Sequence, residues 1–164
     1  IQKVETNLKS INPQAKIIHA ESPVSIDDED AIKGKRILVV EDGPTLTHGG
    51  MPFGAGTIAA KRNEAASMVD PRPYITGTIK ETFETYPNIG AVLPAMGYGK
   101  QQMQDLESTI NNADCDLVLF ATPIALPKLL SINKPTLRVR YEYRDHGSPT
   151  LKKVLLSHLQ KLIK

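Results

Sequence analysis

The run Ile37-Leu38-Val39-Val40 constrains the fold most, because four consecutive apolar β-formers are typical of a strand that is buried on both faces. It lies within Lys35–Asp42, which we interpret as one strand. Residues 43–56 follow directly and contain five glycines and two prolines, which indicates a loop. Helical spacing of apolar residues begins at Thr57 and continues to Met68. Strands buried on both faces occur in parallel sheets, so this segment predicts an α/β fold.

The same alternation of strand and helix patterns continues along the chain. Strand patterns occupy residues 15–20, 89–94, 116–121 and 135–141, and helical patterns occupy residues 4–11, 79–86, 100–110, 126–130 and 150–163. We therefore expect a Rossmann-like three-layer sandwich with a mostly parallel sheet of about five strands. No linker-like stretch divides residues 1–164, which predicts a single α/β domain.

Composition excludes several classes of protein. The net charge of +2 is too balanced for a dedicated nucleic-acid-binding surface. No apolar run approaches the ~18 residues that a membrane-spanning helix needs, which predicts no membrane partner. The single cysteine, Cys115, excludes an internal disulfide and favours a reducing, cytoplasmic location.

The carboxyl end of the clearest strand carries the candidate chemistry, because ligands of parallel sheets bind at that edge. Glycine-rich backbone and the start of the following helix can bind an anion such as phosphate. Glu41 and Asp42 are oxygen ligands suited to Mg²⁺, and His48 can hold a proton or contact a phosphoryl group. The remaining candidates for substrate binding in this loop are Thr45, Thr47, Gly49 and Gly50. Ordinary turn chemistry at Asp42-Gly43-Pro44, and close helix–strand packing at Gly54-x-Gly56, are the structural alternatives.

Three basic side chains elsewhere are candidates for neutralising an anionic substrate. Arg138 and Arg140 alternate on one predicted strand, so they share a face, and arginine binds phosphate or carboxylate in a bidentate manner. Lys100 follows the glycines at 97 and 99. The alternative interpretations are a charged edge strand for the arginines and an exposed turn for the lysine.

The loop and several other motifs resemble the cyclic 2,3-diphosphoglycerate synthetase family, some members of which are described as GTPases. The main match is the block from Gly34 to Gly56, with its Val-Glu-Asp-Gly-Pro-Thr-Leu-Thr-His-Gly-Gly-Met core. The similarity extends to Asn12-Pro13-Gln14-Ala15, Glu21-Ser22-Pro23, Leu93-Pro94-Ala95-Met96-Gly97-Tyr98-Gly99, Ala121-Thr122-Pro123 and Arg138-Val139-Arg140-Tyr141. It therefore covers most of the chain.

The resemblance implies an ATP-dependent ligase that closes 2,3-bisphosphoglycerate into an intramolecular phosphoanhydride, with Mg²⁺ as the metal and a homodimer as the candidate assembly. The chain begins at Ile1 rather than Met and contains no Gly-x-x-x-x-Gly-Lys-Ser/Thr loop for nucleotide phosphates. We therefore expect it to be the C-terminal portion of a larger P-loop-containing enzyme, with ATP bound mainly by the upstream part.

Residue chemistry at the motif positions then suggests roles. Asp42, His48 and Lys100 are the expected catalytic residues, and Glu41 with Asp42 would hold the metal. Thr45, Thr47, Gly49, Gly50, Arg138 and Arg140 would bind a phosphorylated small molecule. Two other functions remain open: the C-terminal part of a P-loop GTPase of the metal-chaperone class, and a non-catalytic anion-binding domain.

Overall fold

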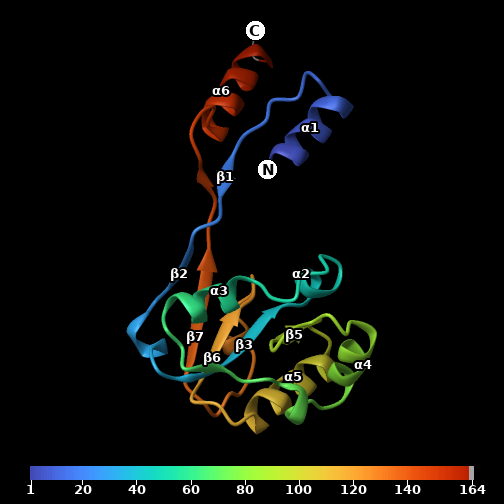
Figure 1. Ribbon diagram of the computed structural model, residues 1–164, viewed down its shortest axis with the longest axis vertical. Helices are drawn as coiled ribbons and strands as arrows, with labels where there is room; N and C mark the ends of the chain where they lie inside the picture. Colours follow the sequence, from blue (N-terminus) through green and yellow to red (C-terminus); the bar gives the residue numbers. More distant parts are fainter. Residues whose placement is uncertain (163–164) are drawn as a thin grey trace. The chain divides into compact units, whose positions relative to one another are not determined.

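The computed structural model describes residues 1–162 (Figure 1). Contacts within the chain separate two units: residues 24–141 form the larger, and residues 1–23 with 142–164 form the smaller. The sequence interpretation treats residues 1–164 as one domain, and that interpretation stays a prediction.

The larger unit is built on a six-stranded sheet in the order β2-β7-β6-β3-β4, with β5 also paired to β3. All its pairings are parallel except that of β2 with β7. The strands are β2 Val24–Ile26, β3 Arg36–Asp42, β4 Ser67–Met68, β5 Leu93–Ala95, β6 Leu117–Ala121 and β7 Thr136–Tyr141. The predicted mostly parallel α/β fold is confirmed.

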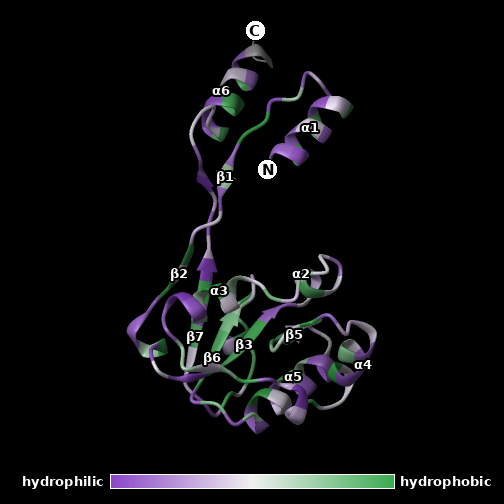
Figure 2. Ribbon diagram, in the orientation of Figure 1, coloured by the Kyte–Doolittle hydropathy of each residue, from purple (hydrophilic) through white to green (hydrophobic). Residues whose placement is uncertain are grey.

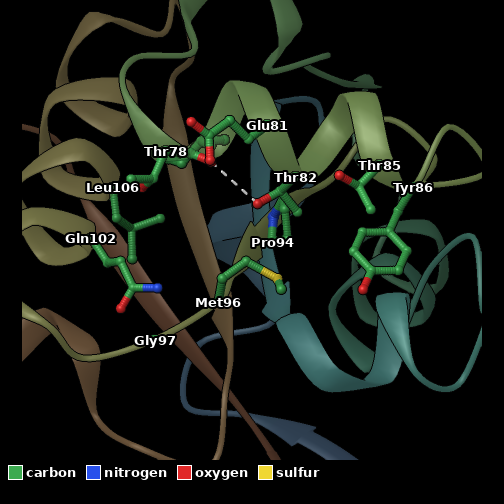
Figure 3. A pocket seen from close by; sticks show the side chains of 11 residues that line it. Thr78, Glu81, Thr82, Thr85, Tyr86, Pro94, Met96, Gly97, Gln102 and Leu106 are labelled. Atoms are coloured by element: carbon green, nitrogen blue, oxygen red, sulfur yellow. Dashed lines mark hydrogen bonds between the residues drawn. The ribbon is translucent and has the colours of Figure 1, made fainter.

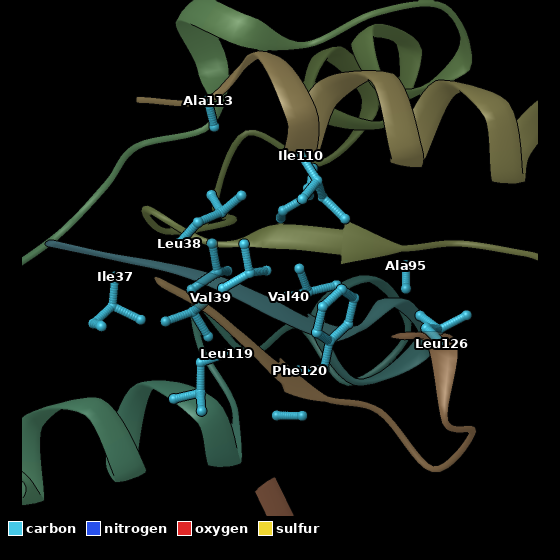
Figure 4. Close-up of a cluster of buried hydrophobic side chains, with 14 of the residues drawn as sticks. Ile37, Leu38, Val39, Val40, Ala95, Ile110, Ala113, Leu119, Phe120 and Leu126 are labelled. Atoms are coloured by element: carbon cyan, nitrogen blue, oxygen red, sulfur yellow. The ribbon is translucent and has the colours of Figure 1, made fainter. Parts of the chain in front are cut away.

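Helices cover both faces of this sheet. The helices are α2 Gly43–Thr47, α3 Ala55–Arg62, α4 Thr78–Thr85 and α5 Lys100–Asn112, with 3₁₀ turns at Asp30–Ile32, Arg72–Tyr74 and Leu126–Lys128. Side chains alternate along β3, so Leu38 packs on the side of Ile110 from α5, whereas Val39 packs on the side of α3 (Figure 4). Hydrophobic residues are concentrated on the central strands β3 and β6 (Figure 2), which are buried on both faces as expected.

The structure corrects the sequence prediction in the segment after β3. Residues 43–56 are not one loop, because Gly43–Thr47 form helix α2, with Pro44 in its first turn. The next helix begins at Ala55 and ends at Arg62, not near Met68. Asn63 terminates it, and Glu64 adopts a positive φ of 56°, which redirects the chain into the short strand β4.

The smaller unit contains helices α1 Gln2–Ile11 and α6 Leu151–Leu162 and a two-stranded antiparallel ribbon. The ribbon pairs β1 Ala20–Glu21 with β8 Arg144–Asp145. The predicted strand over residues 15–20 is therefore wrong in its length, because β1 covers only Ala20–Glu21. It also pairs in the ribbon and does not belong to the main sheet. The helical patterns at both ends of the chain are confirmed as far as residue 162, and residues 163–164 lie outside the described part.

No helix within residues 1–162 has the length and apolar character needed to cross a membrane.

Candidate functional site

The carboxyl ends of β3 and β6 mark the point where the order in which the chain adds strands to the sheet reverses. From β3 the chain continues to β4 and β5 on one side of that strand, and it then crosses through α5 to β6 on the other side. In open α/β sheets the crevice outside the strand ends at such a point is the usual place for a ligand. Asp42 ends β3 there, and Thr122 follows β6.

Asp42 is held at this edge by the local geometry of the β3–α2 turn. It is the residue before the first turn of α2, and its Oδ2 accepts a hydrogen bond from the hydroxyl of Thr45 at 3.1 Å. The Asp42 side chain is only partly buried, so its carboxylate keeps acceptor capacity for a ligand. The Thr45 hydroxyl thus positions the Asp42 carboxylate, and its one donor is no longer available to a ligand.

Glu41 lies on the opposite side of the strand from Asp42 and is 1% exposed. Its Oε1 accepts the backbone amides of Gly54 at 3.0 Å and Thr57 at 2.9 Å, and Oε2 accepts the amide of Gly56 at 3.3 Å. The Thr57 hydroxyl adds a further bond at 3.2 Å. Burial raises the pKa of Glu41, and these hydrogen bonds oppose that shift.

The amino end of α3 therefore already carries an anion from within the chain. The start of this helix was considered in the sequence as an anion site, but three of its amides are donated to Glu41 instead. A Cβ atom at Gly54 would lie 2.6 Å from Oε2 of Glu41, and one at Gly56 would lie 2.6 Å from Cγ1 of Val39. Close helix–strand packing, the structural alternative for Gly54-x-Gly56, is confirmed.

The other candidates from the glycine-rich segment lie in and after α2. Thr47 is buried, and its hydroxyl donates to the carbonyl of Gly43 at 3.1 Å. The amide of Gly49 donates to the Pro44 carbonyl and that of Gly50 to the Thr47 carbonyl. His48 is exposed, and within residues 1–162 its imidazole forms no hydrogen bond or ion pair. In this conformation the two glycine amides are engaged, whereas the imidazole is accessible to solvent.

Arg138 lies on β7 opposite Phe120, which is near the carboxyl end of β6. Its Nη2 donates to the carbonyl of Pro123 at 2.6 Å, which fixes the guanidinium against the loop that follows β6. Its Nε is buried and has no hydrogen-bond partner among the described residues. A buried donor without a partner is rare in folded proteins, and an anionic ligand is one group that would satisfy it.

Arg140 is placed differently although it shares a face with Arg138. Its guanidinium forms an ion pair with Asp27, and that hydrogen bond is the main cause that lowers the pKa of Asp27. The charge of Arg138 also contributes to lowering the pKa of Asp27. Arg140 thus joins β7 to the segment after β2. The alternative of a charged edge strand is wrong for β7, because this strand is paired on both sides, with β2 and with β6.

Tyr141, at the end of β7, was not among the residues selected from the sequence. Burial is the main cause that raises the pKa of its phenol, followed by the negative charges of Asp42 and Glu41, while the charge of Arg138 lowers it. The phenol of Tyr141 is therefore within electrostatic reach of Asp42 and Arg138. Its position as an aromatic hydroxyl at the carboxyl end of a strand was the signal that could have identified it.

Lys100 is the first residue of α5, follows β5 at the same edge of the sheet, and is exposed. Within residues 1–162 no hydrogen bond or ion pair connects Lys100 or His48 to Asp42 or Arg138. In the same part of the chain, no three His, Cys, Asp or Glu side chains are grouped closely enough to form a metal site by themselves. Among the candidates at this edge, Thr45 and Asp42 are joined by a hydrogen bond, and the charges of Asp42 and Arg138 act in opposite directions on the pKa of Tyr141, after the effect of burial.

Comparison with known proteins adds one relative. The chain is similar to the protein named arginine synthetase ArcE of Thermococcus kodakarensis, with 54% identity over 155 residues. The matched region covers 94% of this chain but 35% of that protein, so the chain spans about a third of the length of the curated relative it matches. No family model matches the chain. No solved structure matches it.

Proposed function

We propose that this chain is the substrate-binding part of a nucleotide-dependent, ligase-type synthetase. The observation that carries the proposal is the 54% identity, over 94% of the chain, to a protein named as a synthetase. A binding role for this part fits the absence of a Walker A motif from its sequence, since nucleotide phosphates would then be bound by another part of the enzyme.

The site we assign to the substrate is the crevice between the ends of β3, β6 and β7. Arg138 supplies a fixed positive charge with a buried donor that lacks a partner. Arginine is suited to a planar acidic group, either a carboxylate or one face of a phosphate. Asp42, from the end of β3, and Tyr141, from the end of β7, would contact the other polar groups of the substrate.

We propose an amino acid of the arginine type as the substrate or product, because the relative is named an arginine synthetase. Its α-carboxylate would bind Arg138. Formation of cyclic 2,3-diphosphoglycerate is the second candidate, favoured by the motif block from Gly34 to Gly56. That substrate also has a carboxylate, so the two candidates share the Arg138 contact and differ in the charge of the rest of the molecule.

This part of the enzyme offers few groups that could bind Mg²⁺ or ATP. Asp42 is partly exposed and keeps acceptor oxygens, so it can contribute one ligand to a Mg²⁺ that is held mainly by phosphates. Glu41 does not fit, because three amides and one hydroxyl already occupy its two oxygens. ATP would supply the activated phosphoryl group, while the residues of this chain orient the acceptor.

The test uses the full-length enzyme to which this chain belongs. If the enzyme makes arginine by adding ammonia to a ureido group at the expense of ATP, the reverse reaction breaks that C–N bond. Arginine, ADP and phosphate with Mg²⁺ should then yield ATP, ammonia and the ureido compound. The same protein is incubated with 2,3-bisphosphoglycerate and Mg-ATP to detect a cyclic product. Arginine-dependent ATP formation supports the first candidate, and a cyclic product supports the second. The absence of both products, under conditions where the protein is folded, would overturn the proposal.

A further inference from the structure

A cavity whose lining does not include Arg138 lies between α4, α5 and the end of β5 (Figure 3). Its volume is about 380 Å³, which is within the range of small-molecule sites. It is lined by Thr78, Ile79, Glu81, Thr82, Thr85, Tyr86, Pro94, Met96, Gly97, Gln102 and Leu106. All of these residues belong to the larger unit.

The lining has an apolar part and a polar part on different elements. Pro94, Met96 and Leu106 supply aliphatic surface from the end of β5 and from α5. Residues 78, 82 and 85 occupy one stripe of α4, because residues three or four apart share a face of a helix. Together with the Tyr86 phenol, this stripe supplies hydroxyl groups to the cavity. A ligand for such a cavity has both an aliphatic portion and a hydrogen-bonding end.

The charge of the lining determines which hydrogen-bonding group of a ligand fits the cavity. No Lys, Arg or His contributes to the lining, and Glu81 is its one charged side chain. Within residues 1–162 the carboxylate of Glu81 has no ion pair or hydrogen bond, and the hydroxyls of Thr85 and Tyr86 also have no partner. The Thr82 hydroxyl donates to the Thr78 carbonyl at 3.4 Å and keeps its acceptor capacity. The available groups are one carboxylate and hydroxyls that can accept hydrogen bonds. The negative charge of the carboxylate repels anions and favours N–H donors that carry positive charge.

We propose that this cavity binds a small cation, namely a guanidinium or ammonium group on a short aliphatic stem. The N–H groups donate to Glu81, Thr82 and Thr85, while the stem packs on Met96 and Leu106. The lining of this cavity does not include Arg138, to which we assigned the acidic group of the substrate. The proposal goes beyond the proposed function, since it concerns binding and requires no turnover.

Two side chains of α5, Gln102 and Asp105, hold the surroundings of the cavity in place through hydrogen bonds to backbone amides. The amide of Gly99 donates to Oε1 of Gln102 at 3.3 Å. A Cβ atom at Gly97 would lie 2.3 Å from the same oxygen, so a side chain at position 97 would displace the Gln102 amide from this place. The carboxylate of Asp105 accepts the amide and the hydroxyl of Thr78, each at 2.9 Å, and thereby holds the start of α4 against α5. The cavity is therefore formed before a ligand enters.

The experiment is isothermal titration of the full-length protein with methylguanidinium chloride at low ionic strength. Methylguanidinium has no carboxylate and therefore cannot use Arg138. Wild-type protein should bind it in the millimolar range. Glu81→Gln should weaken binding about fivefold, near the upper value of one exposed ion pair, and Thr85→Val should weaken it further when combined with Glu81→Gln.

Matched variants keep the result interpretable. Glu84→Gln removes an exposed carboxylate from the same helix outside the cavity and should leave the affinity unchanged. Arg138→Lys should also leave methylguanidinium binding unchanged, which separates this site from the proposed substrate crevice. Circular dichroism confirms that each variant is folded. The proposal is overturned if wild-type protein does not bind methylguanidinium, or if folded Glu81→Gln binds it as well as Glu84→Gln does.

Discussion

The carboxylate of Glu41 accepts both the amide and the hydroxyl of Thr57, at 2.9 and 3.2 Å, and so joins the end of β3 to the first turn of α3. Glu41 is 1% exposed, so this contact is made out of water. A side chain that the sequence suggested as a metal ligand is thus the internal anion that completes the start of a helix.

Replacement of Glu41 should destabilise the fold. In Glu41→Gln one acceptor oxygen becomes an NH₂ group that faces backbone amides, so at least one buried amide loses its partner. We expect the free energy of unfolding to fall by about 1–3 kcal/mol, the cost of a buried unsatisfied donor. Urea denaturation measures the change. Glu84→Gln, an exposed change on α4, is the control and should alter stability little; equal stability of the two variants would contradict this role of Glu41.

A methyl group at Gly56 should be tolerated poorly. Its Cβ would lie 2.6 Å from Cγ1 of Val39 and 2.9 Å from Cβ of Ala121, both in the packed centre of the sheet. Gly56→Ala should therefore lower the thermal midpoint, with a loss of about 1–3 kcal/mol that is typical of overpacking. At Gly99 the nearest atom to such a methyl group is the flexible Gln102 side chain, at 3.1 Å, so Gly99→Ala is the milder comparison. A Gly56→Ala protein as stable as Gly99→Ala would contradict the packing described.

The central strand and its neighbours could be predicted from sequence because long apolar runs have one stable environment, a sheet that is covered on both faces. The conformation and contacts of the segment after β3 could not be predicted from sequence. Whether glycine amides bind a phosphate or an internal carboxylate depends on where Glu41 points, and a sequence pattern does not contain that information. Similarly, Arg138 and Arg140 look equivalent in sequence, yet one contacts Pro123 and the other pairs with Asp27.

Asp105 should make the larger unit sensitive to acid. Its carboxylate accepts the Thr78 amide, which is the main cause that lowers its pKa, together with Gln101. A lowered pKa in the folded state means that the unfolded chain binds this proton more readily. The stabilisation is therefore complete above the unfolded pKa of about 3.9 and is lost as the pH falls through the lower, folded value. Urea midpoints measured from pH 6 downward should fall less steeply for Asp105→Asn than for wild-type protein, and parallel curves would contradict this.

The phenol of Tyr141 reports on the charges in the proposed substrate crevice. Because Asp42 raises its pKa and Arg138 lowers it, Asp42→Asn should lower the pKa of Tyr141 and Arg138→Ala should raise it. Protein labelled with ¹³C-tyrosine allows this residue to be titrated separately by NMR. Shifts in the same direction in both variants, or none in either, would show that the three side chains do not share this crevice.

The central claim is that the carboxyl edge of the sheet binds the acidic group of the substrate. Its most direct test is the KM for the substrate of the proposed reaction, measured on the full-length protein with Arg138 variants. Arg138→Ala should raise the KM by about tenfold or more, since a charge-assisted contact is worth about 1.5–3 kcal/mol. Arg138→Lys should recover part of the loss. Lys35→Ala removes an exposed charge beside the opposite end of β3 and serves as the control. An unchanged KM in folded Arg138→Ala protein, with kcat also unchanged, would contradict the claim.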